Sequence, residues 1–85
     1  MPDETWTLYV KPGCPWCEEA SDWLRERGRP FAEIDVLSDR AAFAEMQRLS
    51  GQTLTPTLAI GGGRLVLPDF DVGQLEAFLG KHGLK

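Results

Sequence analysis

The sequence predicts a single α/β domain, residues 1–85, with elements in the order strand, helix, strand, helix, strand, strand, helix. Three observations lead to this class. Polar and apolar residues alternate in two early segments, 5–10 and 31–36, which is typical of strands. Each is followed by a segment of helical composition that ends at a glycine. Two short apolar runs separated by a glycine turn then predict a β-hairpin, and a final helix follows.

The first half of the chain reads as two strands, each followed by a helix. The first strand passes through a Pro-Gly turn into a helix that runs to about residue 27 and ends at Gly28. Because this helix connects it to the strand at 31–36, we expect a parallel pair with a right-handed crossover. The second helix, capped near its start by Ser38 or Asp39, covers residues 41–49 and ends before the next glycine.

The second half changes pattern. Residues 58–67 form the hairpin, with a run of glycines at its turn, and Pro68 closes it. The last helix extends from residue 72 to about residue 80. Asp69 or Asp71 caps this helix, because a carboxylate before the first turn accepts hydrogen bonds from free backbone amides.

The composition excludes several classes of function. The chain has 9 Lys and Arg against 13 Asp and Glu, a net charge of −4. This acidic balance argues against general binding of nucleic acid or anionic membranes, which require a basic face. The sequence has no apolar run long enough to span a bilayer and no recognisable signal peptide. We therefore expect a cytoplasmic monomer whose cysteines meet a reducing environment.

The chemistry is predicted at Cys14 and Cys17, which lie where the first strand gives way to the helix. The first turn of a helix carries unpaired N–H groups and partial positive charge, which stabilise a thiolate. Pro15 suits the first helical position, and Lys11 adds a positive charge if it turns toward the sulfur. Trp16, between the cysteines, is either core or a contact surface for substrate. We predict that Cys14 is the exposed nucleophile and Cys17 the resolving thiol.

Two other roles are open to a pair of cysteines in a small protein. A structural disulfide with so short a loop would constrain the unfolded chain very little. Metal ligation would need further ligands, since one C-x-x-C supplies half of a tetrahedral site and His82 lies near the far end of the chain. The C-x-x-C spacing within a strand–helix–strand pattern favours redox chemistry over both.

These residues resemble the glutaredoxins of the thioredoxin superfamily, of the dithiol C-P-W-C type. Lys11 matches a basic residue that this family carries three positions before its nucleophile. The stretch 50–52, followed after three residues by Pro56, resembles the approach to the family's cis-proline. The resemblance covers nearly the whole chain. It implies a three-layer, thioredoxin-like fold in which three helices pack on a four-stranded mixed sheet, in the order βαβαββα.

The resemblance also implies roles for individual residues. Cys14 would take glutathione or a protein thiol into a mixed disulfide, and Cys17 would resolve it. Lys11 would meet the glycine carboxylate of glutathione, and Trp16 would flank the tripeptide. Thr55 would offer backbone hydrogen bonds to the cysteinyl part. The residues predicted to bind glutathione are Lys11, Pro15, Trp16, Thr55, Pro56, Asp69, Phe70 and Asp71.

One segment departs from the family. Glutaredoxins usually carry a Gly-Gly pair before the last helix, followed by small and acidic residues whose amides hold the γ-glutamyl carboxylate. Residues 65–71 instead read Leu-Val-Leu-Pro-Asp-Phe-Asp, which is bulkier. A helix start can still bind a carboxylate through free amides, so this segment is retained as part of the predicted site.

The sequence therefore predicts a thiol–disulfide oxidoreductase, with glutathione as co-substrate and with no tightly bound cofactor or metal. Its expected partners are glutathione, disulfide-bearing proteins, and the glutathione or thioredoxin reductase system. One alternative is a glutathione-independent redoxin, reduced by thioredoxin reductase and serving ribonucleotide reductase; Phe70 matches an aromatic residue of such redoxins, whereas Pro15 and Trp16 do not match their motif. A further alternative is an iron–sulfur scaffold, against which the rigid ring of Pro15 counts.

Overall fold

The structure is a computed structural model that describes residues 4–84; residues 1–3 and 85 of the expected domain lie outside the described part. The predicted order of elements is confirmed. The elements are β1 (Trp6–Val10), α1 (Pro15–Glu26), β2 (Ala32–Asp35), α2 (Arg40–Ser50), β3 (Thr57–Ile60), β4 (Leu65–Pro68) and α3 (Val72–Lys81). No helix within residues 4–84 has both the length and the apolar character needed to cross a membrane.

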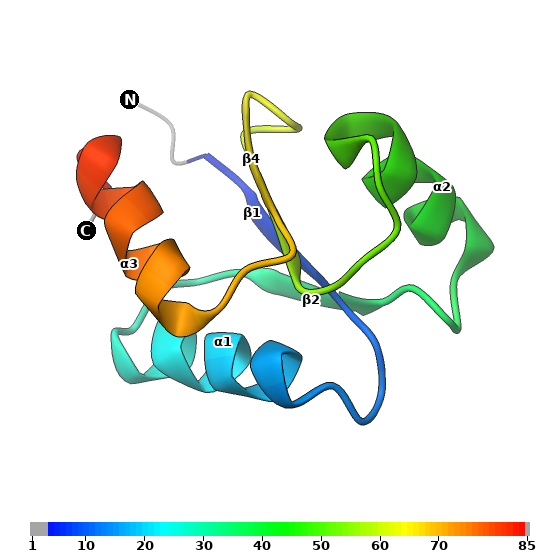
Figure 1. The fold of residues 1–85 in the computed structure, drawn as a ribbon. Coiled ribbons are helices and arrows are strands. Elements are labelled where there is room, and N and C mark those ends of the chain that lie inside the picture. The colour runs from blue at the N-terminus through cyan, green and yellow to red at the C-terminus, as the bar shows by residue number, and fades with distance from the viewer. Residues whose placement is uncertain (1–3, 85) are drawn as a thin grey trace.

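The four strands form one mixed sheet in the order β2-β1-β3-β4. The pair β1–β2 is parallel, as its helical connection predicts, and the other two pairs are antiparallel. Helices α1 and α3 lie on one face of the sheet and α2 lies on the other, which gives three layers (Figure 1). The expected thioredoxin-like architecture is therefore confirmed.

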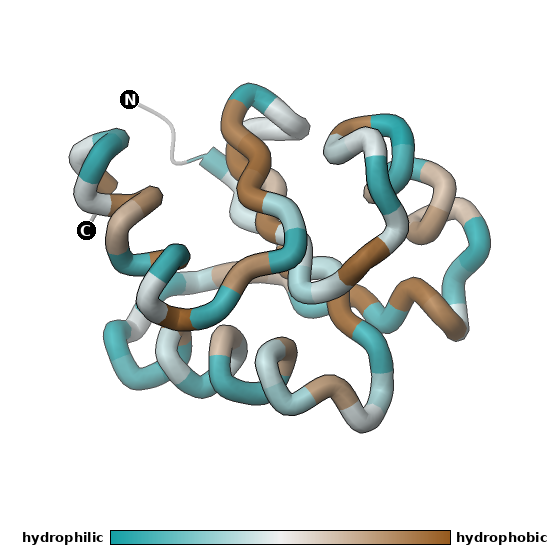
Figure 2. The backbone as a smooth tube through the Cα atoms, in the orientation of Figure 1, coloured by the Kyte–Doolittle hydropathy of each residue, from teal (hydrophilic) through white to brown (hydrophobic). Residues whose placement is uncertain are grey.

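Alternation along the strands divides the core between the two faces of the sheet. Leu8 of β1 and Leu58 of β3 face α1 and α3, where they pack with Leu24 and Leu75. The intervening residue of β1, Tyr9, belongs to a separate cluster under α2. Figure 2 shows that hydrophobic residues gather along the central strands, whereas hydrophobic and hydrophilic residues alternate along the helices. Each face of this small sheet is thus covered by helices that pack on it through a separate apolar cluster.

Capping residues fix where the helices begin. Asp39, rather than Ser38, caps α2, because its Oδ1 accepts a hydrogen bond from the Ala42 amide at 3.0 Å. Gly51 ends that helix in the left-handed conformation, with φ of 72°. Asp71, rather than Asp69, caps α3. Each pair of alternatives from the sequence is thereby resolved to one residue.

Strand register brings the segments that matter for function to one end of the sheet. Tyr9 of β1 lies beside Thr57 of β3, and Thr57 lies beside Pro68 of β4. The turn to Cys14 therefore leaves the sheet at the same end as the loop before β3 and the loop after β4.

Candidate active site

A disulfide joins Cys14 and Cys17 at the start of α1, with their Cα atoms 5.1 Å apart. Cys14 is the N-cap: its backbone is extended, and its Sγ accepts a hydrogen bond from the Cys17 amide at 3.2 Å. Pro15 occupies the first helical turn, where its missing N–H costs no hydrogen bond. After reduction, the amides of this turn would stabilise negative charge on Cys14 Sγ.

The two sulfurs differ in access. Cys14 is half-buried, whereas Cys17 is only 2% exposed and belongs to the core between the sheet and α1. A substrate can therefore reach Cys14 directly. Cys17 can reach only Cys14 Sγ, after that sulfur has formed a mixed disulfide with the substrate. This asymmetry agrees with the predicted roles of nucleophile and resolving thiol.

Loop 51–56, which connects α2 to β3, lies directly against the Cys14 sulfur. Thr55 Oγ1 is 3.8 Å from Cys14 Sγ, and the Thr55 carbonyl oxygen is 3.9 Å from it. The peptide bond between Thr55 and Pro56 is cis, as the resemblance implied. The Pro56 side chain is buried. A hydroxyl and a backbone carbonyl thus stand where an incoming sulfur compound would lie alongside Cys14.

Sequence reasoning missed the residue that holds this loop in place. Gln52 donates from Nε2 to Ser50 Oγ at 2.8 Å and to Thr57 Oγ1 at 3.0 Å. Its Oε1 accepts a hydrogen bond from the Leu54 amide at 2.6 Å. Gln52 therefore links the end of α2, the middle of the loop and the start of β3. The signal available in the sequence was a lone amide side chain between Gly51 and Pro56.

Lys11 points to the same loop. Its Nζ donates to the Thr53 carbonyl oxygen at 3.1 Å and lies 5.9 Å from the centre of the Phe43 ring. The ammonium group is thus held at the outer edge of loop 51–56, and no hydrogen bond to Cys14 Sγ is found for it within residues 4–84. Its predicted contact with a glycine carboxylate stays a prediction.

Exposed apolar side chains lie on the segments that carry these polar groups. Trp16 is 45% exposed and Leu54 is 52% exposed, and each lies on a segment that contacts Cys14 or contains it in sequence. Pro15 is exposed as well. Trp16 is therefore not part of the core, and its predicted role as a contact surface for substrate stays a prediction. The exposure of Leu54 could not be predicted, because nothing in the sequence separates it from a core leucine.

Loop 69–71, between β4 and α3, packs against the core and caps α3. The Phe70 side chain is fully buried with Leu24 and Leu75, so only its backbone could contact glutathione, and its predicted place in the binding site stays a prediction. Asp71 Oδ1 accepts from the Gln74 amide at 2.8 Å, and Gln74 Oε1 accepts from the Asp71 amide at 3.0 Å. Within residues 4–84, no hydrogen bond or ion pair joins Asp69 or Asp71 to Cys14 or loop 51–56.

One titratable group near this end of the sheet has a displaced pKa. Burial of the Tyr9 hydroxyl, together with the nearby Glu45 carboxylate, raises the pKa of Tyr9. The hydroxyl donates to Glu45 Oε1 at 3.4 Å on the α2 face of the sheet. The phenol is therefore protonated and fixes α2 to β1.

No group of three His, Cys, Asp or Glu side chains within the described chain is arranged to hold a metal ion.

A C-x-x-C disulfide at a helix start, beside a loop that carries a cis-proline, defines the class: a thiol–disulfide oxidoreductase of thioredoxin-like fold. The sequence model of the Glutaredoxin family matches residues 6–66. The chain belongs to the glutaredoxin family.

Individual relatives support this assignment. A glutaredoxin of Neisseria meningitidis is 44% identical over 59 residues, which cover 68% of this chain and 69% of that protein. A hybrid peroxiredoxin of Haemophilus influenzae is 37% identical over 59 residues, but the chain spans only 24% of its length. The crystal structure of a thioredoxin-like protein matches with a TM-score of 0.76 at 28% identity, over 88% of this chain and 100% of that one.

Proposed function

We propose that this protein is a dithiol glutaredoxin that takes electrons from glutathione and reduces protein disulfides and glutathione mixed disulfides. The observation that carries the proposal is the unequal access of the two sulfurs, half-buried at Cys14 and 2% exposed at Cys17. A dithiol reductase needs this order, because the first thiol must meet the substrate and the second must meet only the enzyme's own mixed disulfide.

Reduction of a protein disulfide would proceed in two exchanges. The Cys14 thiolate attacks one sulfur of the substrate disulfide, forms a mixed disulfide with it and releases the other sulfur as a thiolate. The Cys17 thiolate then attacks Cys14 Sγ, closes the Cys14–Cys17 disulfide and releases the second substrate thiolate. Two electrons pass to the substrate, and each released thiolate takes a proton from solvent.

Two glutathione molecules would restore the dithiol. The first glutathione thiolate attacks Cys14 Sγ and releases Cys17 as a thiolate. The second attacks the sulfur of the bound glutathione, which yields glutathione disulfide and the Cys14 thiolate. The Cys17 amide, 3.2 Å from Cys14 Sγ, supports the negative charge that returns to Cys14 in this last step.

Loop 51–56 supports the choice of glutathione. Thr55 lies within 4 Å of the reacting sulfur, where its backbone can pair with an extended cysteinyl segment as an added strand does. Lys11 keeps two ammonium N–H donors beyond its bond to Thr53, and these could reach a carboxylate beside the loop. Trp16 offers an apolar surface to the middle of the tripeptide.

A second donor system is favoured by loop 69–71. The Asp71 carboxylate accepts a hydrogen bond from the backbone N–H of Gln74. Fewer backbone amides at the start of α3 therefore remain for a γ-glutamyl carboxylate. A redoxin that lacks this contact could receive electrons from thioredoxin reductase instead. The related hybrid peroxiredoxin makes a peroxiredoxin disulfide a natural protein substrate to test with either donor.

The deciding experiment follows NADPH consumption during reduction of a glutathione mixed disulfide. One arm contains glutathione and glutathione reductase, and the other contains thioredoxin reductase alone. Turnover in the first arm that is lost in Cys14→Ser supports the proposal. Turnover only in the second arm would replace it with the glutathione-independent redoxin.

The variant Cys17→Ser separates the two activities. We expect it to lose reduction of protein disulfides, because no thiol remains to close the enzyme disulfide, and to retain removal of glutathione from mixed disulfides, which needs only Cys14. Equal loss in both assays would contradict the assigned roles.

A further inference from the structure

A cavity of about 290 Å³ lies at the end of the molecule away from the disulfide. Its walls come from the start of β1, the last turn of α1 with the residues that follow, and the end of α3. The twelve-residue α1 is about 18 Å long, so the cavity and Cys14 lie near opposite ends of that helix. We call it the tryptophan cavity; it is lined by Trp6, Trp23, Leu24, Arg27, Arg29, Leu79 and Leu84.

Two guanidinium groups face this cavity, and each lies over a tryptophan ring. The Arg27 guanidinium is 3.6 Å from the centre of the Trp23 ring, and that of Arg29 is 4.3 Å from the centre of the Trp6 ring. Stacking on an aromatic face fixes the plane of a guanidinium group and leaves its N–H donors directed outward. Arg27 also donates from one guanidinium nitrogen to the Trp23 carbonyl oxygen at 3.3 Å, which leaves its other N–H donors for an anion. The two arginines are therefore held in place and keep most of their capacity to bind an anion.

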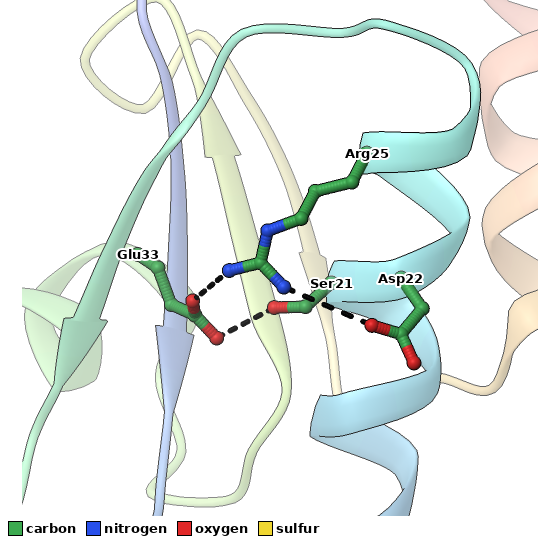
Figure 3. Close-up of polar contacts among 4 residues, drawn as sticks. All are labelled: Ser21, Asp22, Arg25 and Glu33. Carbon is green, nitrogen blue, oxygen red and sulfur yellow. Dashed lines mark hydrogen bonds and ion pairs between the residues drawn. The ribbon is translucent and has the colours of Figure 1, made fainter.

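Neither group has a carboxylate partner among residues 4–84, although the chain carries an excess of acidic residues. The contrast with Arg25, in the last turn of α1, is direct. Arg25 pairs with Glu33 at 2.6 Å and with Asp22 at 3.7 Å, and Ser21 completes the network with a hydrogen bond to Glu33 (Figure 3). Acidic side chains thus account for the placement of Arg25, whereas Arg27 and Arg29 are placed by tryptophan rings.

The rest of the wall is apolar. Trp6, Leu24 and Leu79 are buried in the core beneath the cavity, and Leu84 closes it from the C-terminal side. A volume near 300 Å³ is at the lower end of the range for small-molecule sites, so the occupant is limited to one or two rings. A ligand with an apolar body and a single anionic group would pack on the apolar side chains and pair with the guanidinium groups.

We infer that the tryptophan cavity is a binding site for a small organic anion, with a carboxylate or similar group on an aromatic or branched aliphatic body. The anion would pair with Arg27 and Arg29, and the body would pack on Leu79 and Leu84. The site is separate from the disulfide and does not depend on the electron donor.

The three tryptophans make the test specific, because Trp6 and Trp23 line the cavity whereas Trp16 lies at the disulfide. The full-length protein, labelled with ¹⁵N, is titrated with 2-naphthoate while its indole N–H resonances are followed by NMR. We expect saturable shifts at Trp6 and Trp23 and none at Trp16. The neutral analogue 2-naphthamide should bind about tenfold more weakly, because it lacks the charge-assisted bonds.

Variants then assign the effect to the two arginines. The double variant Arg27→Gln/Arg29→Gln should weaken 2-naphthoate binding by about tenfold or more. Arg25→Gln is the matched control and should leave it unchanged, and Arg29→Lys, which keeps the charge, should retain part of the affinity. Disulfide reductase turnover shows that each variant is folded.

Four outcomes would overturn the inference. They are the absence of saturable shifts at Trp6 and Trp23, a shift at Trp16 alone, equal affinity for the acid and the amide, and an equal loss of binding in Arg25→Gln.

Discussion

Two loops leave the sheet at the end where the disulfide lies, and they are held in opposite ways. Loop 51–56 leads into β3 and is braced by polar side chains, chiefly the three hydrogen bonds of Gln52. Loop 69–71 leads into α3 and is anchored by the buried ring of Phe70 and by the cap at Asp71. The first loop contacts Cys14 Sγ, whereas the second contributes its aromatic side chain to the core.

The difference concerns which groups remain available to a ligand. In loop 51–56 the bracing is internal and local, so the Thr55 hydroxyl and carbonyl stay directed at the sulfur. In loop 69–71 the Asp71 carboxylate accepts from the Gln74 backbone N–H, and the Gln74 side-chain oxygen accepts from the Asp71 backbone N–H. A loop braced by one interior side chain can present its backbone, whereas a loop that serves as a helix cap has already used its polar groups. The following predictions test this contrast.

The largest effect should come from Phe70→Ala. The ring is fully buried between α1 and α3, and its removal leaves a cavity that the surrounding helices cannot fill. We expect a loss of about 3–5 kcal/mol in the free energy of unfolding, measured by urea denaturation. Phe78→Ala, at a half-buried ring on the same cluster, is the control and should cost less. A smaller loss for Phe70→Ala than for Phe78→Ala would mean that this loop is not anchored by its aromatic residue.

Gln52→Ala should have a smaller effect on stability but a direct effect on catalysis. It removes the three bonds that hold loop 51–56 and should cost about 1–3 kcal/mol of unfolding free energy. Because Thr55 then loses its fixed place beside Cys14, kcat/KM for a glutathione mixed disulfide should fall about tenfold. Gln47→Ala, at an exposed position of α2, is the matched control. Unchanged kcat/KM in Gln52→Ala would remove Gln52 as a positioning residue.

The fold and the cysteine pair could be predicted because their signals are local. Alternation in the strands, glycines at the helix ends and the placement of Pro15 at the helix start each depend on neighbours in the sequence. Cys14 as N-cap follows from the same stretch, and the cis bond at Pro56 followed from resemblance to a family.

What could not be predicted depends on how side chains meet in the folded chain. The burial of Phe70 requires the chain to turn at Asp69, and its sequence position alone suggested a place at the site. The role of Gln52 depends on Ser50, Leu54 and Thr57, whose polar groups surround its side chain in the folded loop. The tryptophan cavity is formed by residues from both ends of the chain, so no window of the sequence contains it.

Asp71 offers a test of cap against ligand. Asp71→Ala should lower the unfolding free energy by about 1 kcal/mol, because it removes the acceptor for the Gln74 amide. Asp71→Asn keeps an acceptor there and should be within about 0.5 kcal/mol of the parent. If the carboxylate serves only the cap, KM for glutathione in Asp71→Asn should stay within about twofold of the parent value. A larger rise in KM with unchanged stability would show that the charge of Asp71 binds substrate.

The smallest effect should be that of Asp69→Gly. Asp69 has a φ of 47°, a left-handed conformation that glycine adopts without steric cost. The relief is offset by the greater freedom of glycine in the unfolded chain, so the net change should lie within about 0.5 kcal/mol. Asp69→Ala keeps the steric cost of the left-handed conformation and loses the short polar side chain that favours it. This variant should therefore lower the unfolding free energy by about 1 kcal/mol. Equal losses in the two variants, compared by urea denaturation, would mean that the Asp69 carboxylate rather than the backbone turn holds this loop in place.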